Sequence, residues 1–129
     1  MPEADRYLEK ARRCLADARA SLGFGLSNDA GRGAYLAVFH ASQAFIFERT
    51  ARAAKTHQGV QSEFHRLARN EPRIDPSFPP FLNRAYNLET VADYETERPD
   101  SEIPPERSAE AIETAARLVE CIAGLLAGS

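Results

Sequence analysis

The chain has 129 residues, of which 43% are apolar and 27% are charged, and it contains no tryptophan. This length suits one hydrophobic core, so we expect a single domain over residues 1–129. No run approaches the roughly 18 to 20 apolar residues that span a bilayer, and the charged N-terminus is unlike a secretory signal. These features predict a cytoplasmic protein without membrane contact.

Charge is divided unequally along the chain. Residues 1–73 carry 12 Lys/Arg and 8 Asp/Glu, whereas residues 74–129 carry 4 and 11, so the two parts have charges of +4 and −7 and the whole has −3. A net acidic chain is not a general polyanion binder. The first part can still present a local basic surface, and the opposed charges also suit pairing between subunits or plain solvated helix faces.

Apolar residues recur at steps of three and four along the first part of the chain, which predicts two long helices. The first covers residues 3–22 and ends at Gly23-Phe24-Gly25, because glycine tolerates left-handed backbone. The second covers residues 29–54, with Ser27, Asn28 and Asp29 as candidate caps. Gly31 and Gly33 mark close contact near its start, and its alanine-rich stripe lets another helix approach closely. The stripe consists of Ala30, Ala34, Ala37, Val38, Ala41, Ala44 and Phe45.

The rest of the chain predicts three further helices. A turn at residues 55–60 leads to a short helix over residues 60–69, and four prolines make residues 70–80 a loop. Helices follow over residues 81–94 and 105–126, separated by an acidic connector. Because no segment alternates with a period of two, the sequence predicts an all-α antiparallel bundle of four to five helices without a sheet.

Three local motifs stand out from this pattern. They are Gly33-Ala34-Tyr35-Leu36-Ala37-Val38-Phe39-His40-Ala41, Lys55-Thr56-His57-Gln58-Gly59-Val60 and Val91-Ala92-Asp93-Tyr94. In this order and spacing they resemble the HEPN domain family, and most closely its uncharacterised prokaryotic branch, which is often encoded beside a small nucleotidyltransferase. The resemblance spans about residues 5–125.

The resemblance implies a HEPN-like bundle that is often a homodimer, a place in a toxin–antitoxin or defence-type pair, a nucleotidyltransferase partner, and RNA as a ligand. Many catalytic members of the family are metal-independent ribonucleases that use an arginine, four to six intervening residues and a histidine. Here Glu89 occupies the arginine position and Tyr94 the histidine position. A glutamate repels phosphate, so the ribonuclease motif is not intact and its mechanism does not carry over. We predict neither a cofactor nor a metal.

Arg52 and His57 reproduce the arginine–histidine spacing at a different place, the end of the second predicted helix. One interpretation makes them catalytic, with His57 moving the 2′-hydroxyl proton and Arg52 stabilising the phosphorane charge. The other is that Lys55, Thr56 and His57 cap the C-terminus of the long helix, where cations favour the negative end of the dipole.

Asp93 and Tyr94 also have two interpretations. In the structural one, Asp93 hydrogen-bonds to the turn at Lys55–His57 and fixes the fourth helix against the second. In the functional one, Asp93, Tyr94, Lys55, Thr56 and His57 lie together and bind a nucleotide or an RNA phosphate. The family resemblance further makes Tyr94 a candidate for adenylylation by the partner nucleotidyltransferase.

Three functions follow. The first is a HEPN protein that binds a nucleotidyltransferase partner and RNA. The second is a catalytically silent dimeric helical interaction module, and the third is a metal-independent ribonuclease that uses Arg52 and His57. The sequence leaves open whether the protein is an enzyme.

Overall fold

The computed structural model describes residues 2–94 and 102–128, and for residues 89–94 it describes the backbone alone. Within these ranges there are five helices and no strand, as the sequence predicts. The helices are α1 (Pro2–Gly23), α2 (Ser27–Thr50), α3 (His57–Ala68), α4 (Phe78–Tyr94) and α5 (Pro105–Ala127). None of the described helices is long and apolar enough to cross a membrane.

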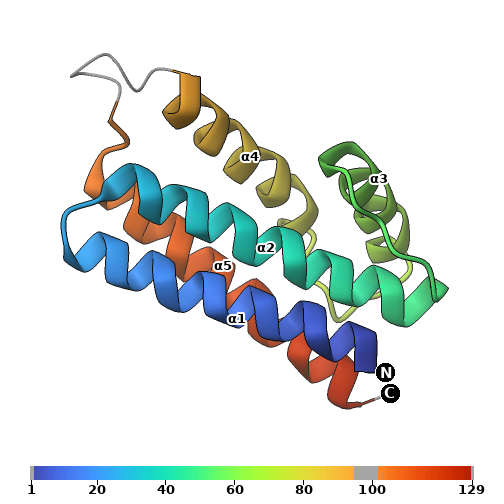
Figure 1. Ribbon diagram of the computed structural model, residues 1–129. Coiled ribbons are helices and arrows are strands. Elements are labelled where there is room, and N and C mark those ends of the chain that lie inside the picture. Colours follow the sequence, from blue (N-terminus) through green and yellow to red (C-terminus); the bar gives the residue numbers. More distant parts are fainter. Residues whose placement is uncertain (1, 95–101, 129) are drawn as a thin grey trace.

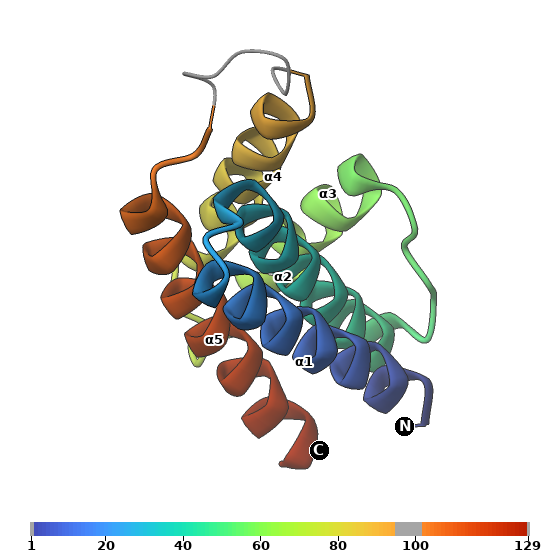
Figure 2. The ribbon, with the colours of Figure 1, turned by 60° about the vertical axis from the view of Figure 1, so that its left-hand side comes forward.

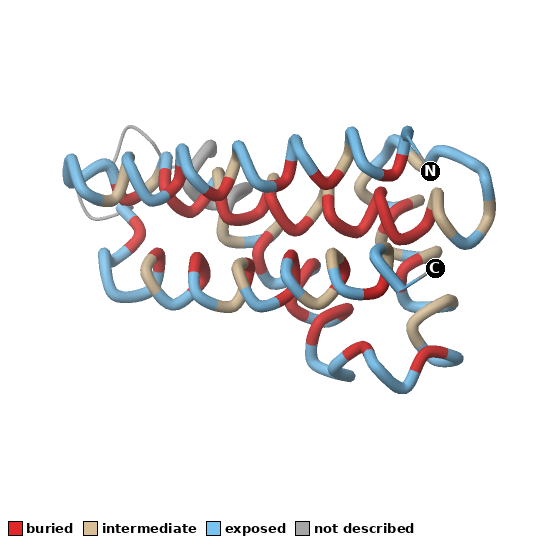
Figure 3. The backbone as a smooth tube through the Cα atoms, turned by 90° about the horizontal axis from the view of Figure 1, so that it is seen from below, coloured by how far each residue is buried: buried red, intermediate tan, exposed pale blue. Residues whose placement is uncertain are grey.

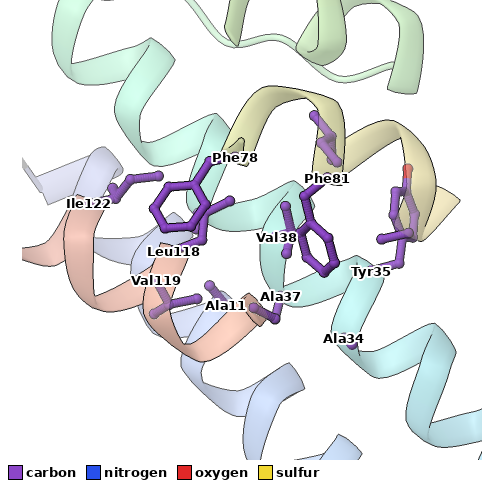
Figure 4. Close-up of a cluster of buried hydrophobic side chains, with 14 of the residues drawn as sticks. Ala11, Ala34, Tyr35, Ala37, Val38, Phe78, Phe81, Leu118, Val119 and Ile122 are labelled. Atoms are coloured by element: carbon purple, nitrogen blue, oxygen red, sulfur yellow. The ribbon is translucent and has the colours of Figure 1, made fainter. Parts of the chain in front are cut away.

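Helix α2 is the centre of the bundle and packs against each of the other four helices (Figure 1). Turning the molecule shows α1 and α5 on one side of α2, with α4 and α3 following one another along another side (Figure 2). The predicted alanine-rich stripe is completely buried, and α2 is buried along most of its length (Figure 3). Larger side chains from α4 and α5, among them Phe81 and Leu118, fill the space around Ala37 and Val38 (Figure 4).

The closest helix contact lies between α1 and α2. A Cβ added at Gly33 would stand 2.7 Å from the Cβ of Ala18 and 3.2 Å from the carbonyl oxygen of Cys14. A Cβ added at Gly31 would meet Ile103 at 2.8 Å. The predicted close contacts at both glycines are therefore confirmed, because neither position has room for a side chain.

The turn between α1 and α2 follows the predicted glycine chemistry. Gly25 has a φ of +77°, and the next amide, that of Leu26, donates to the carbonyl of Ser21 at 2.9 Å. These features form a left-handed C-terminal cap, which closes α1 and reverses the chain into an antiparallel neighbour.

The start of α2 differs from the prediction. Leu26 is the N-cap, and it makes no side-chain hydrogen bond to the helix. Asn28 instead accepts from the amide of Ile103 at 2.8 Å, and the Ser27 hydroxyl donates to the Ile103 carbonyl. Ser108 donates to the Ser27 carbonyl at 2.8 Å. The expectation that Ser27 and Asn28 cap α2 was wrong because residues distant in sequence take up their side chains.

Three other helix boundaries also differ from the predicted ones. Helix α2 ends at Thr50, four residues before the predicted end, and α3 begins at His57. Helix α4 begins at Phe78, so two of the loop prolines lie in its first turn, where the missing N–H costs no hydrogen bond. The final helix agrees with the prediction to within one residue.

The close contact at Gly33 gives a test of the packing. Gly33→Ala should lower the free energy of unfolding by about 1 to 3 kcal/mol, because overpacking outweighs a gain in helix propensity of up to about 1 kcal/mol. Gly124→Ala is the matched control, since nothing lies within 4 Å of an added Cβ there. It should be neutral or stabilising by up to about 1 kcal/mol. Urea unfolding followed by circular dichroism measures both, and equal effects would contradict the packing argument.

Candidate functional site

The connection between α2 and α3 is shaped by two side-chain hydroxyls. Ala51 has a φ of 59°, which ends α2, and the Thr50 hydroxyl accepts from the amide of Arg52 at 3.1 Å. The Thr56 hydroxyl accepts from the amide of Gly59 at 3.0 Å and so caps the N-terminus of α3. The expectation that Lys55, Thr56 and His57 cap the end of α2 was therefore wrong, because these residues begin the following helix.

A buried glutamine ties this connection to the middle of α2. Gln43 donates from Nε2 to the carbonyl of Ala54 at 2.7 Å. Its Oε1 lies 2.7 Å from Nδ1 of His40 and can only accept, so Nδ1 of His40 carries the proton. His40 is half-buried, and its burial lowers its pKa more strongly than the Gln43 bond raises it.

His57 lies in an aromatic cluster between α2 and α4. Its ring stacks on Tyr86 with 3.7 Å between centroids and 14° between planes. The Tyr35 ring packs against both, at 5.8 Å from His57 and 5.6 Å from Tyr86. Tyr35 comes from the first sequence motif and His57 from the second, so the fold brings two of the three motifs together.

Both polar edges of the His57 ring are engaged. The Tyr35 hydroxyl lies 3.0 Å from Nδ1, and Asn83 makes a further side-chain hydrogen bond to the ring. Burial lowers the pKa of His57, and the Asn83 bond opposes this shift only in part. A neutral ring that accepts from Tyr35 and donates to Asn83 satisfies all three groups. This arrangement suits a structural joint between α3 and α4.

Arg52 lies beside a separate hollow of about 450 Å³, between the end of α2 and α3. We call it the Arg52 hollow; its lining is Ile46, Thr50, Arg52, Ala53, Ala54, Glu63 and Arg66. Arg66 forms an ion pair with Glu63 at 2.6 Å. Arg52 is exposed and forms no ion pair with any residue in the described part of the chain.

Arg52 and His57 have different surroundings. Glu63 and Arg66 follow His57 by six and nine residues, which turns them by roughly 240° and 180° around α3. The wall of the Arg52 hollow is therefore formed by the far side of α3, whereas His57 contacts α2 and α4. Among the described residues, no hydrogen-bond or ring partner of His57 is also a hydrogen-bond partner of Arg52.

The remaining predicted site residues have different positions. Lys55 and Thr56 are exposed, and in the sequence they directly follow Ala54, which lines the Arg52 hollow. His65, which is not a predicted site residue, is exposed on α3. Glu89, Asp93 and Tyr94 belong to the last part of α4, and their side chains lie outside the described residues. The predicted link between the turn and α4 therefore has no described contact at Asp93.

The sequence analysis missed Asn83 and Tyr86 as partners of His57. Both lie on α4, seven or more residues before Asp93, and neither belongs to a motif. Their one sequence signal is their spacing of three, which places them on the same side of a helix. Among the described residues there is also no group of three or more His, Cys, Asp or Glu side chains placed to hold a metal ion.

The fold and the motifs together define a class. A central alanine-rich helix with four other helices packed against it agrees with the HEPN-like bundle that the sequence predicts. The HEPN domain matches residues 4–125, so the chain belongs to the HEPN domain family. A Methanocaldococcus jannaschii protein named "Putative toxin MJ0605" is 31% identical over 100 residues, which are 78% of this chain and 74% of that protein.

The two half-buried histidines predict how stability depends on pH. Their folded-state pKa values lie below the unfolded value of about 6.5, so the unfolded chain binds more protons. Their contribution is complete above about pH 6.5 and is lost as the pH falls towards the folded-state values. The free energy of unfolding should therefore decrease between about pH 7.5 and pH 5.5.

Urea unfolding at several pH values measures this slope. His40→Gln and His57→Gln should each flatten it, and His65→Gln is the control for removing an exposed histidine. A slope that survives in the double variant of His40 and His57 would contradict the assignment.

Proposed function

We propose that the protein is a toxin-like HEPN protein that binds RNA at the Arg52 hollow and is controlled by a nucleotidyltransferase partner. Membership of the HEPN family and the similarity to a protein named as a toxin support the class. The observation that carries the binding site is the Arg52 hollow itself, because it combines space, uncompensated positive charge and a position beside an exposed lysine.

The lining of the hollow suits a phosphate group of single-stranded RNA. Arg52 offers a planar fork of N–H donors, and this geometry favours phosphate. Arg66 is the second guanidinium, although Glu63 neutralises part of its charge. Lys55, three residues after Arg52, adds a cation at the rim. Ile46 gives an apolar surface against which a ribose or a base can rest.

The surroundings of His57 favour binding without cleavage. A general base needs a free ring nitrogen within reach of the 2′-hydroxyl. Here Tyr35 and Asn83 already use the ring, and Tyr86 covers one of its faces. Glu89 and Tyr94 stand where the family's ribonucleases carry arginine and histidine. We therefore favour RNA binding over a ribonuclease built from Arg52 and His57.

The partner protein is the second part of the proposal. Phe24 is 84% exposed and Leu26 is 50% exposed, both in the turn between α1 and α2. Two large apolar side chains exposed in one short turn favour a protein contact. The same surface suits a homodimer, which is the alternative of a silent interaction module. Tyr94 is the proposed site of adenylylation by the nucleotidyltransferase.

Fluorescence anisotropy with a labelled single-stranded RNA tests the RNA site. Arg52→Gln and Lys55→Gln should each weaken binding by about three- to tenfold and make the salt dependence shallower, by about 0.7 in the log–log slope per lost contact. Glu63→Gln should strengthen binding, because it frees Arg66. Arg19→Gln on α1 is the matched control and should bind as the unaltered protein does.

Gel analysis of the same RNA separates binding from cleavage. The RNA should remain intact with every variant. If the Arg52→Gln, Lys55→Gln and Glu63→Gln variants bind RNA as tightly as the unaltered protein, the Arg52 hollow is not the RNA site. Cleavage that is lost in both Arg52→Ala and His57→Ala would establish the ribonuclease instead.

A further inference from the structure

A second charged hollow lies between α4 and α5, far from the Arg52 hollow in the sequence. Both helices pack against α2, and side chains such as Phe78 of α4 and Leu118 of α5 meet in the core (Figure 4). The space between them has a volume of about 220 Å³. Its walls carry Arg84 from α4 and Arg107 from α5, with Glu110 and Thr114 one and two turns further along α5. We call it the α4–α5 groove.

The two arginines of the groove keep their charge available. The Arg84 guanidinium lies 5.6 Å above the ring of Phe81, which positions it without neutralising it. Neither Arg84 nor Arg107 forms an ion pair with any residue whose side chain the structure describes. Residues 74–129 contain 4 Lys/Arg against 11 Asp/Glu, so two of the four cations of an acidic region border one small hollow.

The rest of the lining narrows the chemistry of a ligand. The Thr114 hydroxyl accepts from Arg117 at 3.3 Å, which leaves its own hydrogen free to be donated. Phe81 and Leu88 supply an apolar floor. Two guanidinium groups match the double charge of a phosphate monoester, and an apolar floor accommodates its organic part. The volume limits that part to a few atoms, and the acidic surroundings repel a long polyanion.

We propose that the α4–α5 groove binds a small phosphate monoester, held by Arg84 and Arg107 from opposite walls and by the Thr114 hydroxyl. Such a ligand bridges α4 and α5 at the surface of the bundle. Glu110 opposes it, because a carboxylate in the same groove repels the phosphate. The α4–α5 groove shares no residue with the Arg52 hollow. A failure of the phosphate site would therefore leave the proposed RNA site untouched, and the reverse also holds.

NMR titration of the ¹⁵N-labelled protein at low ionic strength tests the site, with glycerol 3-phosphate as the probe. Amide shifts should be confined to residues 81–88 and 107–114. Arg84→Gln and Arg107→Gln should each weaken binding by about three- to tenfold. Glu110→Gln should strengthen it by a similar factor. All three side chains are exposed, so the variants should fold normally, and Arg19→Gln is again the control.

Three further probes define the ligand class. Glycerol should cause no shifts, and inorganic phosphate and succinate should bind more weakly than glycerol 3-phosphate. Equal binding of inorganic phosphate and glycerol 3-phosphate would overturn the role of the apolar floor. The site itself would be overturned by the absence of shifts with any probe at about 10 mM, or by a Glu110→Gln variant that binds no better than the unaltered protein.

Discussion

The whole bundle depends on how closely its neighbours can approach α2. Packing distance between helices is set by the side chains at the contact, and alanine and glycine allow the shortest distances. On α2, Gly33 faces Cys14 and Ala18 of α1 so closely that an added Cβ would overlap Ala18, and Gly31 faces Ile103 in the same way. Small residues bury little apolar area, so larger buried side chains must supply the volume of the core. They come from several helices, with Phe45 on α2, Phe64 on α3 and Leu118 on α5 among them.

Much of this architecture could be predicted from periodicity alone. Five helices, the buried stripe of α2 and the glycine turn after α1 follow from local rules that the structure obeys. The errors concern side chains with more than one possible partner. Ser27 and Asn28 are good caps in any sequence, yet here they bind a segment about 75 residues away. Thr56 can end one helix or begin the next, and the left-handed backbone at Ala51 decides between them.

The candidate site was predictable as a place but not as a set of contacts. The motif around His57 lies at the connection between α2 and α3, as its position in the sequence predicts. Its stacking on Tyr86 could not be foreseen, because it depends on the angle at which α4 crosses α2. Arg52 and His57 are five residues apart in sequence, yet the left-handed residue and the new helix between them give them different neighbours. Spacing that would place two side chains together on one helix has no such meaning across a helix boundary.

The central position of α2 has a consequence for the order in which the structure opens. Amide hydrogens exchange with solvent when local or global unfolding exposes them. Since α2 contacts all four other helices, its own hydrogen bonds open only when the bundle as a whole comes apart. Helix α3 is the shortest of the described helices, and the His57 stack and the buried side chains of Val60 and Phe64 hold it in place. We expect it to detach before the other helices do. We therefore expect the amides of α2 to exchange slowly and those of α3 to exchange faster. Helix α3 also forms one wall of the Arg52 hollow.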